Sequence, residues 1–185
     1  MKSLIEKLLA AVGLVCASPV LLLLWPLIAL TSKGPVIFRQ ERVGRDRKTF
    51  FCYKFRTMAM GTKQAGTHEV SASAVTSIGR ILRATKLDEL PQLWNILKGE
   101  MSFVGPRPCL PSQEELIDER EERGVFSILP GVTGLGQIRG IDMSEPRRLA
   151  ECDAEYVNSR SPGGDIGIIW KTLTGSGRGD RVSKG

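Results

Sequence analysis

An acidic pair surrounded by basic residues is the constellation in this chain best suited to chemistry. Asp88 and Glu89 are adjacent in TKLDELPQLWNIL, at the expected start of a helix. An aspartate can attack phosphorus and form an acyl phosphate, and a carboxylate pair can hold Mg²⁺ beside a phosphate. The plainer interpretation is that the pair caps free N–H groups and complements the helix dipole. Taken alone, the two residues favour capping.

Cations on both sides of the pair favour the chemical interpretation. The residues preceding it include Arg80, Arg83 and Lys86. Arg107 follows the same expected helix, in SFVGPRP. The prolines on either side of Arg107 restrict the local backbone, which reduces the entropy that the arginine loses on binding a phosphate. A plain turn is the alternative for this stretch.

The surrounding patterns predict the elements that must position these groups. Two β-prone runs between Pro35 and Met58 flank the polar GRDRK, which predicts a basic β-hairpin. Lys54 and Arg56 lie among apolar neighbours at the end of its second strand, so they are better candidates than the solvated cations of the hairpin. Two helices are expected next, one from Thr76 and one ending at Lys98-Gly99. Their apolar faces fit either a membrane interface or ordinary core packing.

The longest apolar segment begins near the amino terminus and contains a proline at its centre. No charged residue lies between Lys7 and Lys33, and such a length of helix can cross a hydrocarbon core of roughly 30 Å. Pro19 deprives the Val15 carbonyl of its helical partner, and Ser18 can donate back to that turn. Basic residues follow and precede the segment, and positive charge prefers the cytoplasmic side. The residues leave open a kinked span and a re-entrant helix–break–helix.

Composition narrows the classes of partner. The formal net charge is +6, which suits an anionic partner, and aromatic residues make up 6%, which disfavours a base-stacking nucleic-acid platform. The four cysteines are far apart and the chain has one histidine, so a zinc site is not expected. That histidine, His68, lies in a polar loop and is given no role. Scattered cysteines fit a reducing compartment.

Several stretches, in order and spacing, resemble the bacterial sugar transferase family, the small monotopic phosphoglycosyl transferases. They are the Ser-Pro of the apolar segment, PVIFRQERVG, YKFRTM, LRATKLDELPQLWNILKGEMSFVGPRP and LPGVTGLGQ, which together span about Leu14 to Gln137. The resemblance implies a mixed α/β, predominantly α fold with a short β-hairpin and interfacial amphipathic helices around a cytosolic active site. It implies a re-entrant membrane anchor at 1–33, a catalytic domain at 34–175 and a flexible basic tail at 176–185.

The resemblance also implies an activity. Such enzymes transfer a sugar-1-phosphate from a UDP-sugar to undecaprenyl phosphate at the bacterial inner membrane, releasing UMP, as the first membrane step of glycoconjugate assembly. Asp88 matches the nucleophile that forms a covalent phosphosugar intermediate, and Glu89 supports the required Mg²⁺. The phosphate-handling positions of the family match Lys54, Arg83 and Arg107. Its membrane-break positions match Ser18 and Pro19. The sequence after Gln137 resembles a subgroup that handles N-acetylated deoxyamino sugars.

Two other interpretations remain open at the level of sequence. A membrane-anchored basic protein that only binds lipid head groups or nucleic acid would explain the charge and the anchor, but not an acidic pair amid arginines. A single-span protein with an extracytoplasmic domain would differ in topology. The resemblance favours UDP-sugar, undecaprenyl phosphate and membrane lipids as partners, with no nucleic acid, and leaves the oligomeric state open.

Overall fold

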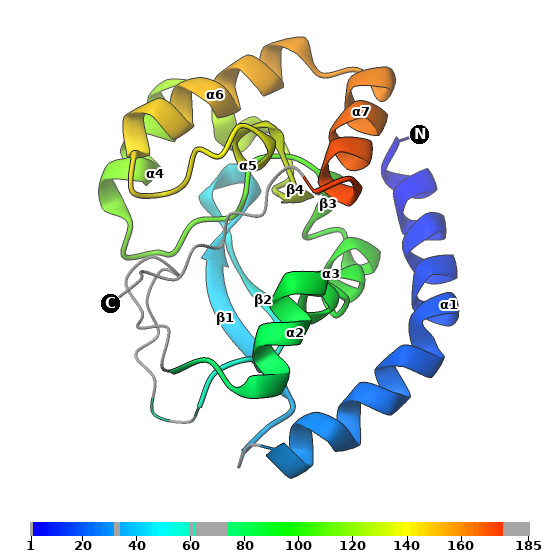
Figure 1. Cartoon of the computed structure of the whole chain (residues 1–185). Coiled ribbons are helices and arrows are strands. Elements are labelled where there is room, and N and C mark those ends of the chain that lie inside the picture. The colour runs from blue at the N-terminus through cyan, green and yellow to red at the C-terminus, as the bar shows by residue number, and fades with distance from the viewer. Residues whose placement is uncertain (1, 32–33, 60, 62–73, 176–185) are drawn as a thin grey trace. The chain divides into compact units, whose positions relative to one another are not determined.

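The computed structural model describes residues 2–31, 34–59, 61 and 74–175 (Figure 1). Within them the chain forms two compact units, one from the described residues of 2–40 and 52–98, the other from those of 41–51 and 99–175. The expected division at 33 and 175 stays a prediction. The predicted tail at 176–185 and the loop that contains His68 lie outside the described residues.

The expected mixed, mostly helical architecture with a short β-hairpin is confirmed. Strands β1 (Ile37–Val43) and β2 (Thr49–Phe55) pair as a two-stranded sheet. A 3₁₀ turn, η1 (Arg45–Arg47), joins them. Asp46 and Arg47 adopt positive φ angles of 56° and 58° there, so a tight polar turn reverses the chain between the two apolar runs.

The apolar segment forms one helix, α1 (Lys2–Thr31), which continues through Pro19 and Pro26. This differs from the expected helix–break–helix. The Ser18 Oγ donates to the Val15 carbonyl at 2.7 Å, and this is the acceptor that Pro19 leaves without its helical N–H. The serine thus compensates the proline, and α1 bends along its length without ending (Figure 1). The re-entrant topology stays a prediction.

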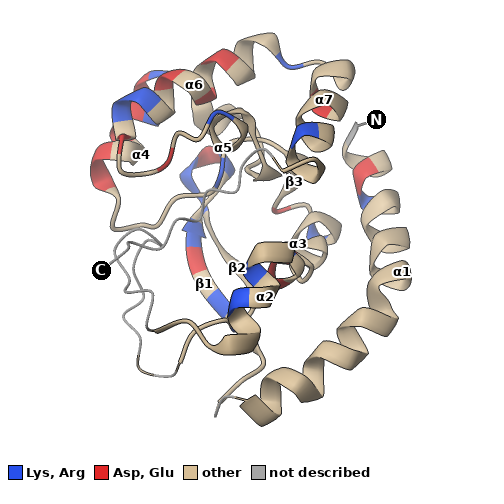
Figure 2. Cartoon of the chain, in the orientation of Figure 1, with Lys and Arg blue, Asp and Glu red and all other residues tan. Residues whose placement is uncertain are grey.

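Most of the apolar surface of α1 is exposed, although one side of the helix packs on the protein. α1 contacts α3 (Gln92–Lys98), and Leu24 and Ile28 are buried in a cluster with Val36, Phe55 and Leu82. Elsewhere, for example, Val15 and Leu30 are 73% and 86% exposed. By length and composition α1 can cross a membrane, and Figure 2 shows charged residues only near its start. Water is a poor solvent for such a surface, so it requires an apolar cover.

Of the helices that flank the acidic pair, the expected start at Thr76 and the expected end at Lys98-Gly99 are confirmed, whereas the helix expected to start at Asp88-Glu89 begins at Gln92. Helix α2 (Ser77–Thr85) is capped by Thr76, whose Oγ1 accepts from the Gly79 N–H at 3.0 Å. Helix α3 ends before Gly99, which has a φ of 80°. Ile81 on α2 and Trp94 on α3 are exposed by 60% and 54%. The expected interfacial position of these helices stays a prediction.

The second unit contains a short parallel strand pair that the sequence did not predict. β3 (Ser102–Val104) pairs with β4 (Gly131–Thr133), with Ser102 opposite Gly131 and Val104 opposite Thr133. A Cβ on Gly131 would lie 2.1 Å from the Gly105 nitrogen, so LPGVTGLGQ packs its backbone directly against that of SFVGPRP. Three-residue strands carry no readable alternation, which is why the pattern missed them.

The remaining helices complete this unit, and two of them, at 146–159 and 162–173, pack on the strand pair. They are α4 (Glu114–Glu122), η5 (Val125–Ser127), α5 (Leu135–Ile138), α6 (Pro146–Ser159) and α7 (Pro162–Leu173). The core between α4 and α6 is formed by residues such as Leu116, Leu149 and Cys109. The expected helix start at Ser144-Glu145-Pro146 is confirmed by Pro146 in the first turn of α6.

Candidate active site

The acidic pair occupies a single 3₁₀ turn, η4 (Leu87–Glu89), between α2 and α3. Lys86 has a φ of 58°, and this left-handed residue ends α2 and redirects the chain into η4. Asp88 is 6% exposed and the Glu89 side chain 12% exposed. Neither carboxylate is a solvated surface charge, so both need specific partners in the fold.

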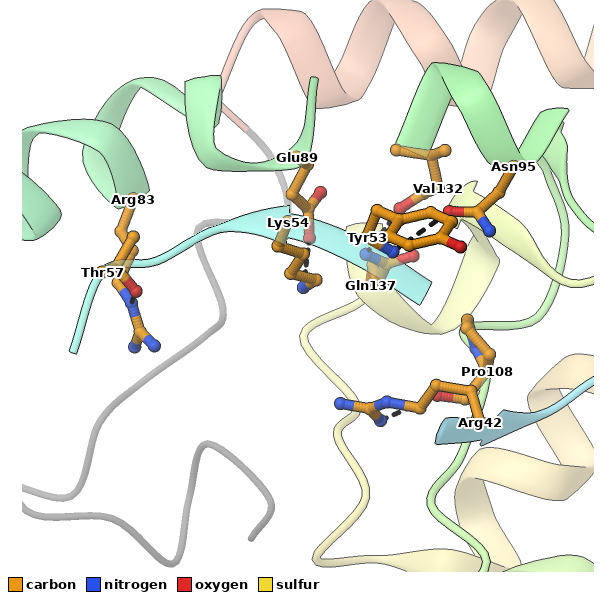
Figure 3. Close-up of polar contacts among 10 residues, drawn as sticks. All are labelled: Arg42, Tyr53, Lys54, Thr57, Arg83, Glu89, Asn95, Pro108, Val132 and Gln137. Atoms are coloured by element: carbon orange, nitrogen blue, oxygen red, sulfur yellow. Dashed lines mark hydrogen bonds and ion pairs between the residues drawn. The ribbon is translucent and has the colours of Figure 1, made fainter. Parts of the chain in front are cut away.

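Lys54, near the end of β2, forms an ion pair with Glu89. Its Nζ donates to Glu89 Oε1 at 2.9 Å, with side chains 19% and 12% exposed (Figure 3). The structure therefore brings together two of the predicted site residues, which are 35 positions apart. Because the pair is largely shielded from water, its attraction is screened less than that of a surface pair.

Asn95 makes a second connection between β2 and α3, which the sequence analysis missed. Its Oδ1 accepts the Tyr53 N–H at 3.1 Å, and the residue is fully buried (Figure 3). An asparagine within the apolar stripe LWNIL was the available signal, because buried polar side chains require partners. The bonds of Tyr53 and Lys54 thus hold β2 against the segment that carries Asp88 and Glu89.

Arg83 is oriented by a residue that the sequence analysis did not single out. Its Nε donates to the Thr57 Oγ1 at 2.9 Å, just after β2 (Figure 3). Its Nη1 is buried and has no acceptor among the described residues. A buried donor left unpaired costs about 1–3 kcal/mol, so an anion that accepts from it would be favoured. The geometry fits the predicted phosphate-handling role.

Arg56 and Arg107 have different surroundings. Arg56 is 6% exposed and its Nη1 donates to the Pro35 carbonyl, so this guanidinium supports the strand end. Arg107 belongs to the second unit, where its carbonyl accepts from Arg120 at 2.9 Å. Lys54, Arg83, Asp88 and Glu89 all belong to the first unit, as do Ser18 and Pro19.

The donor set near η4 fits Mg²⁺ that a substrate helps to coordinate. No group of three or more His, Cys, Asp or Glu residues able to hold a metal occurs among residues 2–31, 34–59 and 74–175. Mg²⁺ is usually bound by one or two carboxylates together with substrate phosphates, rather than by an all-protein cage. Asp88 and Glu89 would supply such carboxylates, with Lys54 engaging Oε1 of Glu89.

We predict that the Lys54–Glu89 pair is energetically coupled. Lys54→Met and Glu89→Gln should each lower the free energy of unfolding by about 1–3 kcal/mol, because each removes one charge of an ion pair that is largely shielded from water. The double variant should lose less free energy of unfolding than the two single variants lose together, as measured by denaturant unfolding in detergent. The exposed pair Arg147–Glu151, with side chains 74% and 54% exposed, is the matched control and should show little coupling. Strict additivity for Lys54 and Glu89 would contradict the pairing.

Comparison with known proteins identifies the family. The family model described as bacterial sugar transferase matches residues 1–178. The exopolysaccharide production protein ExoY of Sinorhizobium fredii is 37% identical over 186 residues, covering 91% of this chain and 81% of that protein. The undecaprenyl-phosphate galactose phosphotransferase of Salmonella typhimurium is 36% identical over 176 residues, covering 86% of this chain.

Several relatives are much longer than this chain. The UDP-N-acetylgalactosamine-undecaprenyl-phosphate N-acetylgalactosaminephosphotransferase of Aeromonas hydrophila is 35% identical over 178 residues, which cover 91% of this chain. The aligned region spans 41% of the length of that protein and 37% of the Salmonella one. Because the family model covers nearly all of the sequence, the chain belongs to the bacterial sugar transferase family.

Proposed function

We propose that this protein is a membrane-associated phosphoglycosyl transferase, which moves a sugar-1-phosphate from a UDP-sugar to undecaprenyl phosphate and releases UMP. Relatives are named as undecaprenyl-phosphate sugar phosphotransferases, with UDP-N-acetylgalactosamine or UDP-glucose in two of the names. The observation that carries the proposal is the position of the acidic pair. Asp88 and Glu89 lie on the turn before α3, and α3 packs against the exposed apolar helix α1.

The proposed reaction has two displacements at one phosphorus. A carboxylate oxygen of Asp88 forms a bond to the sugar-bearing phosphorus of the donor, the bond from that phosphorus to the bridging oxygen breaks, and UMP leaves with the electron pair. An oxygen of undecaprenyl phosphate then bonds to the same phosphorus and Asp88 leaves. Asp88 is 6% exposed, and such burial limits hydrolysis of the acyl phosphate by water.

The basic residues have distinct parts in this proposal. Lys54 holds Glu89 through its ion pair, and Arg83 offers the donor at Nη1 to a phosphate oxygen. Arg107 binds a phosphate of the nucleotide sugar. Mg²⁺ held by Asp88 and Glu89 would offset negative charge on the phosphates. Substrate anions that meet these cations gain charge-assisted hydrogen bonds, which are stronger than neutral ones.

We predict a covalent phosphosugar on Asp88. Incubation with UDP-sugar and Mg²⁺, without the lipid acceptor, should give an adduct on the peptide that contains Asp88, detected by mass spectrometry. Asp88→Asn should abolish the adduct and reduce UMP release on the order of 10³-fold or more, because the variant lacks the nucleophile. Asp118→Asn, an exposed acidic position on α4, is the control and should keep full activity.

Two outcomes would overturn parts of this proposal. Normal UMP release by Asp88→Asn in the presence of undecaprenyl phosphate would exclude the covalent route. No UMP release by wild-type protein across a panel of UDP-sugars would favour a protein that only binds. The same panel tests the proposed donor class, because an N-acetylated deoxyamino sugar should be turned over faster than a simple hexose.

We also propose that α1 enters and leaves the cytosolic face of the inner membrane. Lys7 precedes the uncharged segment and Arg39 follows it. Because positive charge prefers the cytosolic side of the membrane, both residues are placed favourably when both ends of the segment lie on that side. The Ser18 bond to Val15 supports a bent helix, as a re-entrant segment requires.

Cysteine labelling tests this topology. In a Cys16→Ser background the remaining native cysteines are buried, so Ser3→Cys and Thr49→Cys add one exposed thiol before and one after the apolar segment. Both thiols should resist an impermeant maleimide in spheroplasts and react after lysis. Labelling of either thiol in intact spheroplasts would contradict the re-entrant topology.

A further inference from the structure

The backbone of residues 106–109 is held through four consecutive carbonyls. The donors to Pro106, Arg107, Pro108 and Cys109 are the Gly131 N–H, Arg120 Nη1, Arg42 Nη1 and the Val43 N–H, each at 2.9 Å. We call this set the carbonyl clamp. Its donors come from three separate elements, β1, α4 and β4, so the loop cannot shift without breaking bonds to several of them.

The carbonyl clamp leaves one side chain at the surface. Residues 104–110 are all described, and each is buried except Arg107, which is partly exposed. Pro106 and Pro108 have fixed φ angles and no N–H, which removes two further degrees of freedom from the loop. The fold therefore fixes the main chain on both sides of Arg107, the one residue of this stretch that is partly exposed.

Arg120, on α4, is the member of the clamp whose charge is most costly to remove from water. It is 1% exposed, and its Nε and Nη2 donate to Oδ2 of Asp153 at 3.0 and 2.6 Å. Burial disfavours the Arg120 charge, but Asp153 outweighs it and raises the pKa of the guanidinium above its usual value. A buried ion pair is seldom more stabilising than apolar packing, so stability alone is a weak reason for this one. Its third hydrogen bond, from Nη1 to the Arg107 carbonyl, holds that carbonyl in position.

Arg42 holds the other side of the loop from the hairpin. Its Nη1 donates to the Pro108 carbonyl, as Figure 3 shows, while the neighbouring Val43 N–H donates to Cys109. A lysine at position 42 or 120 would supply a single ammonium in place of the planar fork, with a different reach. Arg120 and Arg42 thus donate to adjacent carbonyls, those of the Arg107–Pro108 and Pro108–Cys109 peptide bonds.

We propose that Arg42 and the Arg120–Asp153 pair are positioning residues for Arg107. They hold the Arg107 backbone so that its guanidinium meets a substrate phosphate without a further loss of loop entropy on binding. This inference rests on the proposed function, because it needs Arg107 to bind the donor.

A double-mutant cycle on donor turnover tests the inference. Arg42→Met removes the donor to the Pro108 carbonyl and leaves the Arg120–Asp153 pair intact, whereas Arg120→Met alone would strand Asp153 and could prevent folding. We expect Arg42→Met to raise KM for the UDP-sugar by about tenfold with a smaller change in kcat, since charge-assisted hydrogen bonds have this order of effect. In an Arg107→Ala background the same substitution should change KM by less than about twofold. Arg148→Met, an exposed arginine paired with Glu145 on α6, is the control.

Hydrogen exchange over residues 99–112 supplies the readout of the clamp itself. Exchange in this segment should rise in Arg42→Met and in Arg120→Met with Asp153→Leu, and should stay unchanged in Arg148→Met. If exchange is unchanged in both clamp variants, or if Arg42→Met and Arg107→Ala have additive effects on KM while wild-type turnover is normal, the inference is wrong and the proposed function stands. If wild-type protein releases no UMP with any UDP-sugar, the proposed function fails and the inference fails with it.

Discussion

The apolar surface of α1 is the constraint on which the other features of the first unit depend. Most of the large apolar side chains of this 30-residue helix are exposed, which is unfavourable in water, and a bilayer would supply the cover that the fold leaves out. Since α3 packs on α1, and η4 precedes α3, the depth of α1 in the membrane sets the depth of Asp88. The proposed lipid acceptor carries its phosphate at that surface, so the anchor contributes proximity to the reaction.

Polar contacts then set the geometry of the acidic pair. The Lys54–Glu89 ion pair ties β2 to η4, and the Tyr53–Asn95 hydrogen bond ties the neighbouring residue of β2 to α3. Thr57, two residues beyond β2, holds Nε of Arg83. β2 and the residues just after it thus orient the Glu89 carboxylate, helix α3 and the Arg83 guanidinium. Phe55 of β2 is buried in the same apolar cluster as Leu82 of α2.

The sequence predicted those features of the fold that depend on local chemistry. The hairpin, the helix start at Thr76, the stop at Lys98-Gly99 and the bond from Ser18 to the turn before Pro19 all follow from spacing and side-chain type. The helix was expected to break at Pro19, but one local hydrogen bond was sufficient to preserve it. Resemblance to a family supplied the roles of Asp88 and Arg107, which residue types alone left open.

Long-range partners could not be predicted, because periodicity carries no information on which distant residues meet. Asn95 was visible as a polar residue in an apolar stripe, yet its acceptor role for Tyr53 depends on how β2 packs on α3. The parallel pairing of β3 with β4 depends on close backbone approach at Gly105 and Gly131. The buried Arg120–Asp153 pair joins residues 33 positions apart on two different helices, and the sequence analysis singled out neither residue.

The most direct measurement of the central claim is the depth of α3 in a bilayer. Trp94 is 54% exposed on α3, so a variant with Trp25→Phe and Trp170→Phe leaves it as the single fluorophore. In vesicles with brominated lipids, quenching of Trp94 should be strongest for bromines near the head groups and weak for those at the bilayer centre. Absence of quenching, or a maximum at the bilayer centre, would contradict an acidic pair held at the membrane surface.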